Sequence, residues 1–182
     1  AVNTIVNDDG KLTGYITDGE GFVHNLKDHG VDIKGKKITV AGGGGAATAI
    51  QVQCALDGAR EITIFNIKDA FFERTLQTAE KIRKAVPGIV VNVYDIADTA
   101  KMTEEITSSD IFANATIVGM KPMDDQSVVK DLSAFRPGLV VCDAVYNPAE
   151  TKLLREAKEA GCTCIGGKGM LLWQGVAAFK LY

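Results

Sequence analysis

Four consecutive glycines, residues 42–45, have the clearest chemical use in this 182-residue chain. They follow an apolar stretch typical of a strand and precede an Ala-rich stretch typical of a helix, which predicts a strand–turn–helix unit. In such a unit Gly42 permits a tight turn, Gly44 lets the backbone approach a pyrophosphate, and the helix that begins after Gly45 offers free N–H groups. Ala47 replaces the third glycine of the common G-x-G-x-x-G pattern, where alanine is accepted. The turn therefore predicts a dinucleotide site, with a purely structural turn as the alternative.

The elements that must position this turn alternate regularly from residue 36 onwards. Apolar, β-branched runs and helical patterns follow one another, which predicts βαβ units and a parallel sheet with right-handed crossovers. We therefore expect an α/β fold, a Rossmann-like doubly wound parallel sheet. The expected strands are residues 37–41, 61–66, 89–94, 111–114, 139–143 and 162–165, and the expected helices are residues 46–56, 70–85, 99–107, 150–160 and 170 onwards.

The first 35 residues follow a different pattern. Two β-branched runs flank the turn sequence Asp8-Asp9-Gly10, which predicts a hairpin over residues 1–16. Apolar residues at helical spacing follow, with Gly30 as a C-cap, and we expect a linking helix within residues 19–35. The chain opens as if within a strand and stops inside a helical pattern, so we expect both ends to be truncated.

Composition excludes several classes of function. The net charge of −3 offers no basic surface for nucleic acid or anionic lipid, and no apolar run reaches the roughly 20 residues of a membrane span. Four cysteines without a CxxC pair are typical of reduced, buried thiols, which favours a cytoplasmic protein. His24 and His29 are five positions apart and poorly placed to share an ion, so we expect no metal site.

Seven motifs in a fixed order make the chain resemble the shikimate dehydrogenase family over its whole length. Asn66-x-Lys68-Asp69 followed by Phe71-Phe72 is most similar to the quinate/shikimate dehydrogenase branch. The motifs are Ala1-Val2-Asn3-Thr4, Gly14-Tyr15-x-Thr17-Asp18-Gly19, Gly42-x-Gly44-Gly45-Ala46, Asn114-Ala115-Thr116, Gly119-Met120, Val145-Tyr146-Asn147-Pro148 and Gly169-Met170-Leu171-Leu172-x-Gln174.

This resemblance implies NAD(P)-dependent interconversion of 3-dehydroshikimate or 3-dehydroquinate and the corresponding hydroxy acid. It also implies a division into a remnant of the N-terminal substrate domain (1–18), a linking helix (19–35) and a cofactor domain (36–182). The family's Ser-x-Ser carboxylate site and catalytic lysine have no counterpart in these residues. We therefore expect the chain to be inactive alone. The resemblance leaves a homodimer of the longer protein open.

The resemblance assigns roles residue by residue. Asp18 matches the carboxylate of the catalytic pair, which holds an ammonium group charged and oriented while that group donates a proton. Without the resemblance, an aspartate before Gly19 is more typical of an N-cap or a turn. Asn3, Tyr146 and Gln174 match substrate-binding positions. The positions matched to cofactor binding are Gly42, Gly44, Gly45, Ala46, Asn66, Lys68, Asp69, Asn114, Thr116, Met120 and Gly167.

Two departures bear on specificity. Ile16 replaces an asparagine that usually precedes Thr-Asp-Gly, and Ile67 replaces an arginine that commonly follows Asn66 and grips the 2′-phosphate of NADP. Asp69 can accept a hydrogen bond from a free 2′-hydroxyl and would repel a phosphate, whereas Lys68 can pair with one. We therefore expect NAD as the cofactor, with NADP as the alternative.

Two other functions remain as alternatives. A dinucleotide-binding module without catalysis would share the glycine turn but have no catalytic lysine upstream. Methylene-tetrahydrofolate dehydrogenases have a related fold, but they do not join Thr-Asp-Gly to Gly-Met-Leu-Leu-x-Gln.

Overall fold

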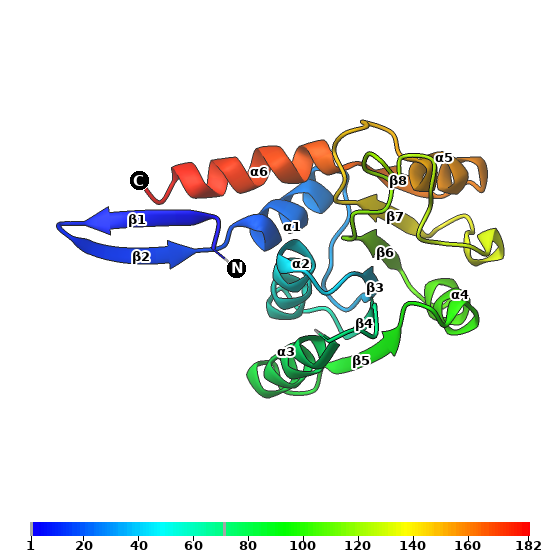
Figure 1. Cartoon of the computed structure of the whole chain (residues 1–182), viewed down its shortest axis with the longest axis horizontal. Coiled ribbons are helices and arrows are strands. Elements are labelled where there is room, and N and C mark those ends of the chain that lie inside the picture. Colours follow the sequence, from blue (N-terminus) through cyan, green and yellow to red (C-terminus); the bar gives the residue numbers. More distant parts are fainter. Residues whose placement is uncertain (1, 71) are drawn as a thin grey trace.

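The computed structural model describes residues 2–70 and 72–182, so the predictions for Ala1 and Phe71 lie outside the described residues. Its main feature is a parallel sheet with the strand order β5-β4-β3-β6-β7-β8 (Figure 1). This is the doubly wound order 3-2-1-4-5-6, in which the chain reverses direction across the sheet beside β3. The Rossmann-like fold predicted from the sequence is confirmed. The strands are β3 (Lys37–Ala41), β4 (Glu61–Asn66), β5 (Val90–Asp95), β6 (Ile111–Asn114), β7 (Val140–Asp143) and β8 (Thr163–Ile165).

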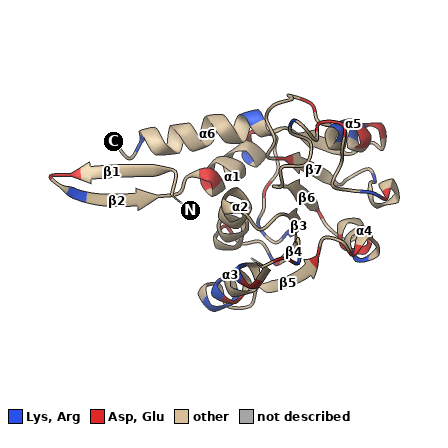
Figure 2. Cartoon of the chain, in the orientation of Figure 1, with Lys and Arg blue, Asp and Glu red and all other residues tan. Residues whose placement is uncertain are grey.

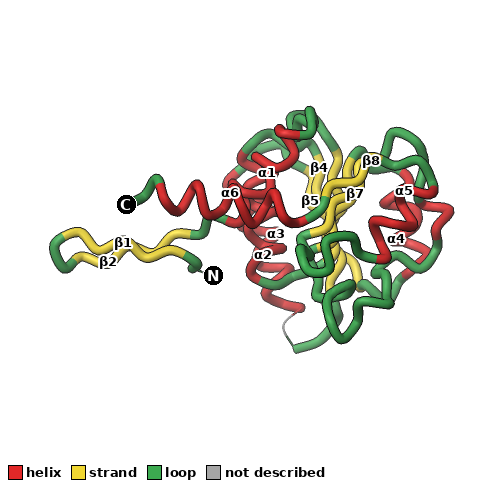
Figure 3. The backbone as a smooth tube through the Cα atoms, turned by 90° about the horizontal axis from the view of Figure 1, so that it is seen from above, coloured by secondary structure: helices red, strands yellow, loops and turns green. Residues whose placement is uncertain are grey.

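Helices cover both faces of this sheet (Figure 3). One face carries α1 (Asp18–Asp28), α2 (Gly45–Leu56), α3 (Phe72–Ala85) and α6 (Gly167–Phe179). The other carries α4 (Thr99–Thr107), α5 (Lys152–Glu159) and a 3₁₀ turn at Leu132–Ala134. Each layer encloses its own cluster of buried apolar side chains. The central strands are therefore buried on both faces, as a parallel sheet requires.

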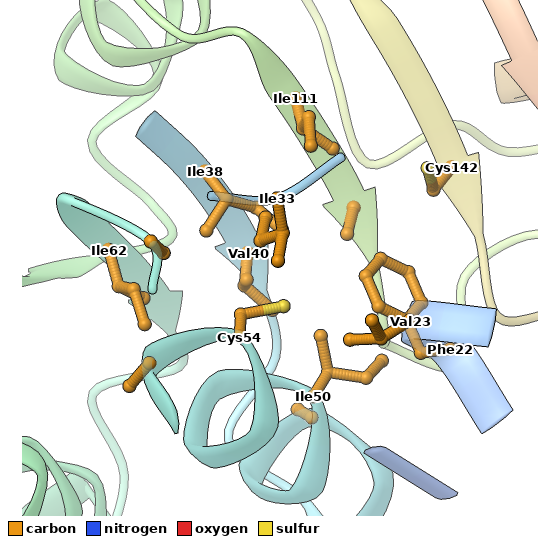
Figure 4. Packing of buried hydrophobic residues seen from close by; sticks show 14 of the residues in the cluster. Phe22, Val23, Ile33, Ile38, Val40, Ile50, Cys54, Ile62, Ile111 and Cys142 are labelled. Atoms are coloured by element: carbon orange, nitrogen blue, oxygen red, sulfur yellow. The ribbon is translucent and has the colours of Figure 1, made fainter. Parts of the chain in front are cut away.

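The core beneath α2 explains why the glycine turn is fixed in place. Figure 4 shows Ile38 and Val40 of β3 packed towards Ile50 and Cys54 of α2. All four side chains are fully buried. A strand and a helix anchored on the same core leave the turn between them little freedom to move.

The first two strands stand apart from the sheet. Strands β1 (Thr4–Asp8) and β2 (Lys11–Tyr15) pair antiparallel through a two-residue loop with positive φ at Asp9 and Gly10, as a tight hairpin turn requires. Figure 1 shows this hairpin projecting from the body of the molecule beside the C-terminal half of α6. Its side chains are mostly exposed, including Leu12 at 69 %.

The helix expected within residues 19–35 is α1, which ends at Asp28, and Gly30 just beyond it adopts a φ of +72°, as expected for a glycine at the end of a helix. The structure corrects the start of the last helix, which begins at Gly167, three residues before the predicted start. Three glycines within residues 166–169 disfavour a helix locally, but close packing against neighbouring segments admits no larger side chain at two of them.

Charged residues are spread over the helices. Basic and acidic residues occur together along α3 and α5 (Figure 2). Within residues 2–70 and 72–182, no helix has both the length and the apolar character needed to cross a membrane.

Candidate functional site

The glycine turn lies at the carboxyl end of β3, where the sheet order reverses and open α/β sheets bind their ligands. Gly42 has a φ of +124°, and a Cβ atom there would lie 2.7 Å from the carbonyl oxygen of Ala115. A Cβ atom on Gly43 would collide with Asn66. These two glycines are therefore required by the close approach of the turn to the ends of β4 and β6.

Packing does not require a glycine at position 44. It is the N-cap of α2 in an extended conformation, makes no side-chain cap, and nothing lies within 4 Å of the position of a Cβ atom. The first N–H groups of α2 therefore face open space without a side-chain acceptor. This arrangement fits a pyrophosphate, because the helix dipole and free N–H groups both favour an anion.

Two cavities flank the glycine turn. The first, which we call the turn cavity, has a volume of about 420 Å³ and lies between the turn, residues 115–121 and residues 144–147. The second, the strand-end cavity, has a volume of about 540 Å³ and extends from the turn past Asn66 and Ile67 to residues 96–99 and 123–130. Together they offer an elongated site whose middle is the N-terminus of α2.

A third, smaller cavity of about 260 Å³ contains the predicted catalytic carboxylate, and we call it the Asp18 cavity. Asn3 Nδ2 donates to Asp18 Oδ1 at 2.9 Å and lies 3.4 Å from Gln174 Oε1. The backbone N–H of Thr17 donates to Asn3 Oδ1 at 3.1 Å. The side chains of Asn3, just before β1, of Asp18 in α1 and of Gln174 in α6 thus meet although they are far apart in the sequence.

Two glycines of α1 hold Asp18 at this position. A Cβ atom on Gly19 would collide with the carbonyl oxygen of Ala49 in α2, and one on Gly21 would lie 2.7 Å from the backbone nitrogen of Gln174 in α6. Helix α1 therefore packs backbone to backbone between the helix of the glycine turn and the helix that carries Gln174 (Figure 1).

The predicted site residues divide into three groups. Several line the cavities: the turn cavity is lined by Gly44, Gly45, Ala46, Thr116, Met120 and Tyr146, the strand-end cavity by Gly42, Gly44, Asn66 and Thr116, and the Asp18 cavity by Asn3, Asp18, Ala46, Tyr146, Gly167 and Gln174. Gly167 also packs so tightly that a Cβ atom would lie 2.7 Å from the carbonyl oxygen of Val145. Lys68 and Asp69 are exposed beyond the end of β4. Asn114 is buried and lines none of the three cavities.

Asn114 belongs to a buried hydrogen-bond network centred on Asp143. Asp143 Oδ1 accepts from Asn114 Nδ2 at 3.0 Å and from the N–H of Val145 at 2.9 Å, and its Oδ2 accepts from Thr151 Oγ1 at 2.6 Å. Burial raises the pKa of Asp143 to about 6, against the opposing effect of these three hydrogen bonds. Groups with perturbed pKa values cluster at functional sites, so we include this buried carboxylate in the candidate site.

Sequence reasoning missed Asp143 and much of the strand-end cavity. The missed lining residues include Ile96, Ala97, Thr99, Ile117, Val118, Gln126, Ser127, Val128 and Lys130. Asp143 could have been predicted as a site residue, because it ends a predicted strand and the carboxyl ends of parallel strands share one edge of the sheet. Residues 126–130 belong to a long loop without periodicity, and no sequence pattern there indicates a site.

The residues that the structure describes hold no group of three or more His, Cys, Asp or Glu side chains arranged to bind a metal ion. All four cysteines are free. Cys54 and Cys142 are buried as predicted, whereas Cys164 on the edge strand β8 and Cys162 just before it are half-buried.

Comparison with known proteins agrees with this geometry. No family model matches the chain. Quinate/shikimate dehydrogenase from Escherichia coli O139:H28 is 50% identical over all 182 residues, which span 63% of that protein. Shikimate 5-dehydrogenase from Listeria monocytogenes, solved in complex with shikimate and NAD, is also 50% identical, with a TM-score of 0.95 over 100% of this chain and 63% of that one.

Over its whole length the chain is similar to members of the shikimate dehydrogenase family. Shikimate 5-dehydrogenase from Thermus thermophilus, solved in complex with NADP(H) and shikimate, is a more distant relative at 31% identity and a TM-score of 0.79, over 100% of this chain and 61% of that one. Relatives of this family have thus been solved with either dinucleotide. The chain spans about three-fifths of the length of these relatives.

Proposed function

We propose that this chain is the dinucleotide-binding part of an NAD(P)-dependent oxidoreductase that interconverts a 3-dehydro acid, 3-dehydroshikimate or 3-dehydroquinate, and its hydroxy acid. The observation that carries the proposal is that the turn cavity and the Asp18 cavity adjoin, because Ala46, Ala144 and Tyr146 line both. A dinucleotide site and a cluster of polar side chains therefore meet at one place.

The dinucleotide would lie along the two cavities that flank the glycine turn. Residues 44–46 would hold the pyrophosphate, since their N–H groups open the helix α2. The adenosine would occupy the strand-end cavity, because the ribose in this fold is recognised near the end of the second strand, here Asn66. The nicotinamide end would then enter the turn cavity, beside Met120 and Tyr146.

When bound, the dinucleotide supplies or accepts the hydride, and the protein orients the reactants and handles one proton. Asp18 is placed to hold a neighbouring ammonium group or substrate hydroxyl, since Asn3 already fixes the direction of one carboxylate oxygen. Asn3 and Gln174 can bind further substrate hydroxyls at the same cavity. Tyr146, which borders both cavities, would separate the substrate from solvent on one side.

The substrate assignment rests on the relatives, since the quinate/shikimate dehydrogenase matches this whole chain at 50% identity. We propose that the 182 residues bind the dinucleotide but do not turn over substrate by themselves, because no lysine lines the Asp18 cavity in the described parts of the chain. Such a general acid commonly contributes about 10²–10⁴-fold to the rate. Location in the cytoplasm, supported by four free cysteines, is part of the same proposal.

The test uses one substitution at the N-cap of α2. In Gly44→Asp, the carboxylate would cap the helix and occupy the place of the pyrophosphate with like charge. We expect NAD affinity measured by calorimetry to fall by about 100-fold or more, while thermal stability is unchanged or slightly raised.

Gly166→Asp is the matched control, since Gly166 is an extended N-cap glycine of α6 without a side-chain cap and lines none of the three cavities. We expect its NAD affinity to equal that of the wild type. Equal NAD binding by Gly44→Asp and the wild type would contradict the proposed site.

A further inference from the structure

Asp143 is 3 % exposed and lines none of the three cavities, yet its carboxylate accepts a hydrogen bond from Val145, which lines the turn cavity. Its carboxylate accepts hydrogen bonds from three separate segments: Asn114 at the end of β6, the backbone of Val145, and Thr151 at the N-cap of α5. An ionised carboxylate only accepts hydrogen bonds, so all three donors are matched. Nothing in the reaction outlined above uses this group.

Asn114, the first donor, links Asp143 by hydrogen bonds to the loop after β6. Asn114 Nδ2 also donates to the carbonyl oxygen of Val118 at 3.0 Å, and Asn114 Oδ1 accepts from the N–H of Thr116 at 3.1 Å and from its hydroxyl at 2.7 Å. The side-chain amide of Asn114 can satisfy these contacts in only one orientation, because its oxygen and nitrogen have opposite roles. Asp143 selects that orientation by accepting from the nitrogen.

The second donor fixes the segment after β7. The N–H of Val145 points back to Asp143, which turns residues 144–147 towards the turn cavity. Gly119, with a φ of +100°, packs against this centre as well, since a Cβ atom there would lie 3.2 Å from Thr151 and 3.9 Å from Asp143 Oδ2. Residues 115–121 and 144–147 are two walls of the turn cavity, and the glycine turn is the third.

We propose that Asp143 is a positioning residue for dinucleotide binding: one buried carboxylate sets the distance and orientation of the two loops that enclose the nicotinamide end of the ligand. The inference rests on the proposed function, because it assumes that the turn cavity receives a dinucleotide. It goes further in assigning the shape of that cavity to a residue that never touches the ligand. Pre-organised loops spare the entropy of ordering them on binding, so affinity depends on the network.

A substitution at Thr151 distinguishes the positioning of the two loops from a general contribution to stability. Its hydroxyl accepts from the N–H of Leu154 as the N-cap of α5 and donates to Asp143, but it does not contact Asn114 or the residue 115–121 loop by hydrogen bonds. Thr151→Val therefore removes a cap and one bond to Asp143 while leaving both loops tied to the carboxylate. It is the matched control for a loss of stability without a loss of loop positioning.

The experiment measures NAD affinity of the 182-residue chain by calorimetry, at a temperature where circular dichroism shows each variant folded. We expect Asp143→Ala to bind NAD about tenfold or more weakly, because both loops lose their anchor. We expect Asp143→Asn to remain within about threefold of the wild type, since its oxygen can serve Asn114 and Val145 and its nitrogen can donate to Thr151. Thr151→Val should lose thermal stability but keep its NAD affinity.

Two results would overturn the inference while the proposed function stands: wild-type affinity in Asp143→Ala, or equal losses of affinity in Asp143→Ala and Thr151→Val. Should Asp143→Ala not fold, Asn114→Ala against Thr151→Val decides in the same way, because Asn114→Ala releases only the loop after β6. A wild-type chain that binds neither NAD nor NADP would instead contradict the proposed function itself.

Discussion

The turn cavity and the Asp18 cavity adjoin but are built in different ways. The turn cavity is enclosed by three backbone segments: a glycine turn anchored by a buried strand and helix, and two loops tied to one buried carboxylate. The Asp18 cavity is made of partly exposed side chains from three distant segments, joined chiefly through the amide of Asn3. The first therefore follows from the fold of the sheet, whereas the second depends on how the hairpin, α1 and α6 sit together.

The largest effect that separates the two regions is expected from Asp18→Asn. In this chain the substitution should leave NAD affinity within about twofold, because Asp18 does not line the cavities of the glycine turn. In a version of the protein that includes the residues found upstream in the relatives, kcat should fall by about 10²–10⁴-fold, since the general acid loses its charged partner.

Isothermal titration with NAD and steady-state formation of NADH from shikimate or quinate measure these two quantities. Glu20→Gln, two residues away in the same helix and outside the Asp18 cavity, is the control and should change neither. An unchanged kcat in Asp18→Asn would mean that Asp18 only caps or turns the chain.

A second effect concerns the buried carboxylate of Asp143. Burial raises the pKa of Asp143 to about 6, from an unfolded value of about 3.9. Folding therefore favours the protonated form, so the stability from this group is complete below pH 4 and is lost as the pH rises through 6. The loss is on the order of 2–3 kcal/mol in the free energy of unfolding.

Urea denaturation of the wild type and of Asp143→Asn at several pH values between 4 and 7 isolates this contribution, because the asparagine does not titrate. The difference in unfolding free energy, wild type minus variant, should fall as the pH rises. A difference that stays constant or rises with pH would show that Asp143 is not held in the buried environment described above.

The smallest effect is expected at the outer end of the strand-end cavity. Ile67 lines this cavity and offers no cation to a 2′-phosphate, while Lys68 and Asp69 follow on the exposed side. We propose that NAD is preferred, with Asp69 serving the ribose hydroxyl. Asp69→Ala should then weaken NAD binding by about threefold and reduce the difference in affinity between NAD and NADP.

Titrations of both dinucleotides at low and moderate salt measure this preference. NADP binding that is tighter than NAD binding and weakens steeply with salt would show that Lys68 decides the choice. In that case Asp69→Ala would have little effect, and Lys68→Met would remove the preference for NADP.

The sheet could be predicted from the sequence because its information is local. Strand and helix patterns alternate with glycine punctuation, and such alternation with right-handed crossovers gives a doubly wound parallel sheet. The helix boundaries near glycines could not be predicted in the same way. The start of α6 at Gly167 depends on its tight packing against Val145, a contact between residues 22 positions apart.

The candidate site likewise combines a local motif with contacts between distant residues. The glycine turn is a local motif, and its geometry is as expected. The meeting of Asn3, Asp18 and Gln174 became a prediction only through the family resemblance, because nothing in their spacing brings residue 174 to residue 3. Asn114 matched the cofactor loop in sequence, yet the structure buries it beside Asp143, where it shapes that loop.

The most direct test of the account is a titration of NAD into the isotope-labelled 182-residue chain, followed by the NMR shifts of its backbone amides. The account predicts shifts at residues 42–47, which form the turn and the start of α2, and at residues 115–121 and 144–147. It predicts no shifts in the hairpin β1–β2, which lines neither cavity of the glycine turn. Unshifted amides at residues 44–46 in the presence of saturating NAD would contradict the claim that this glycine turn binds the dinucleotide.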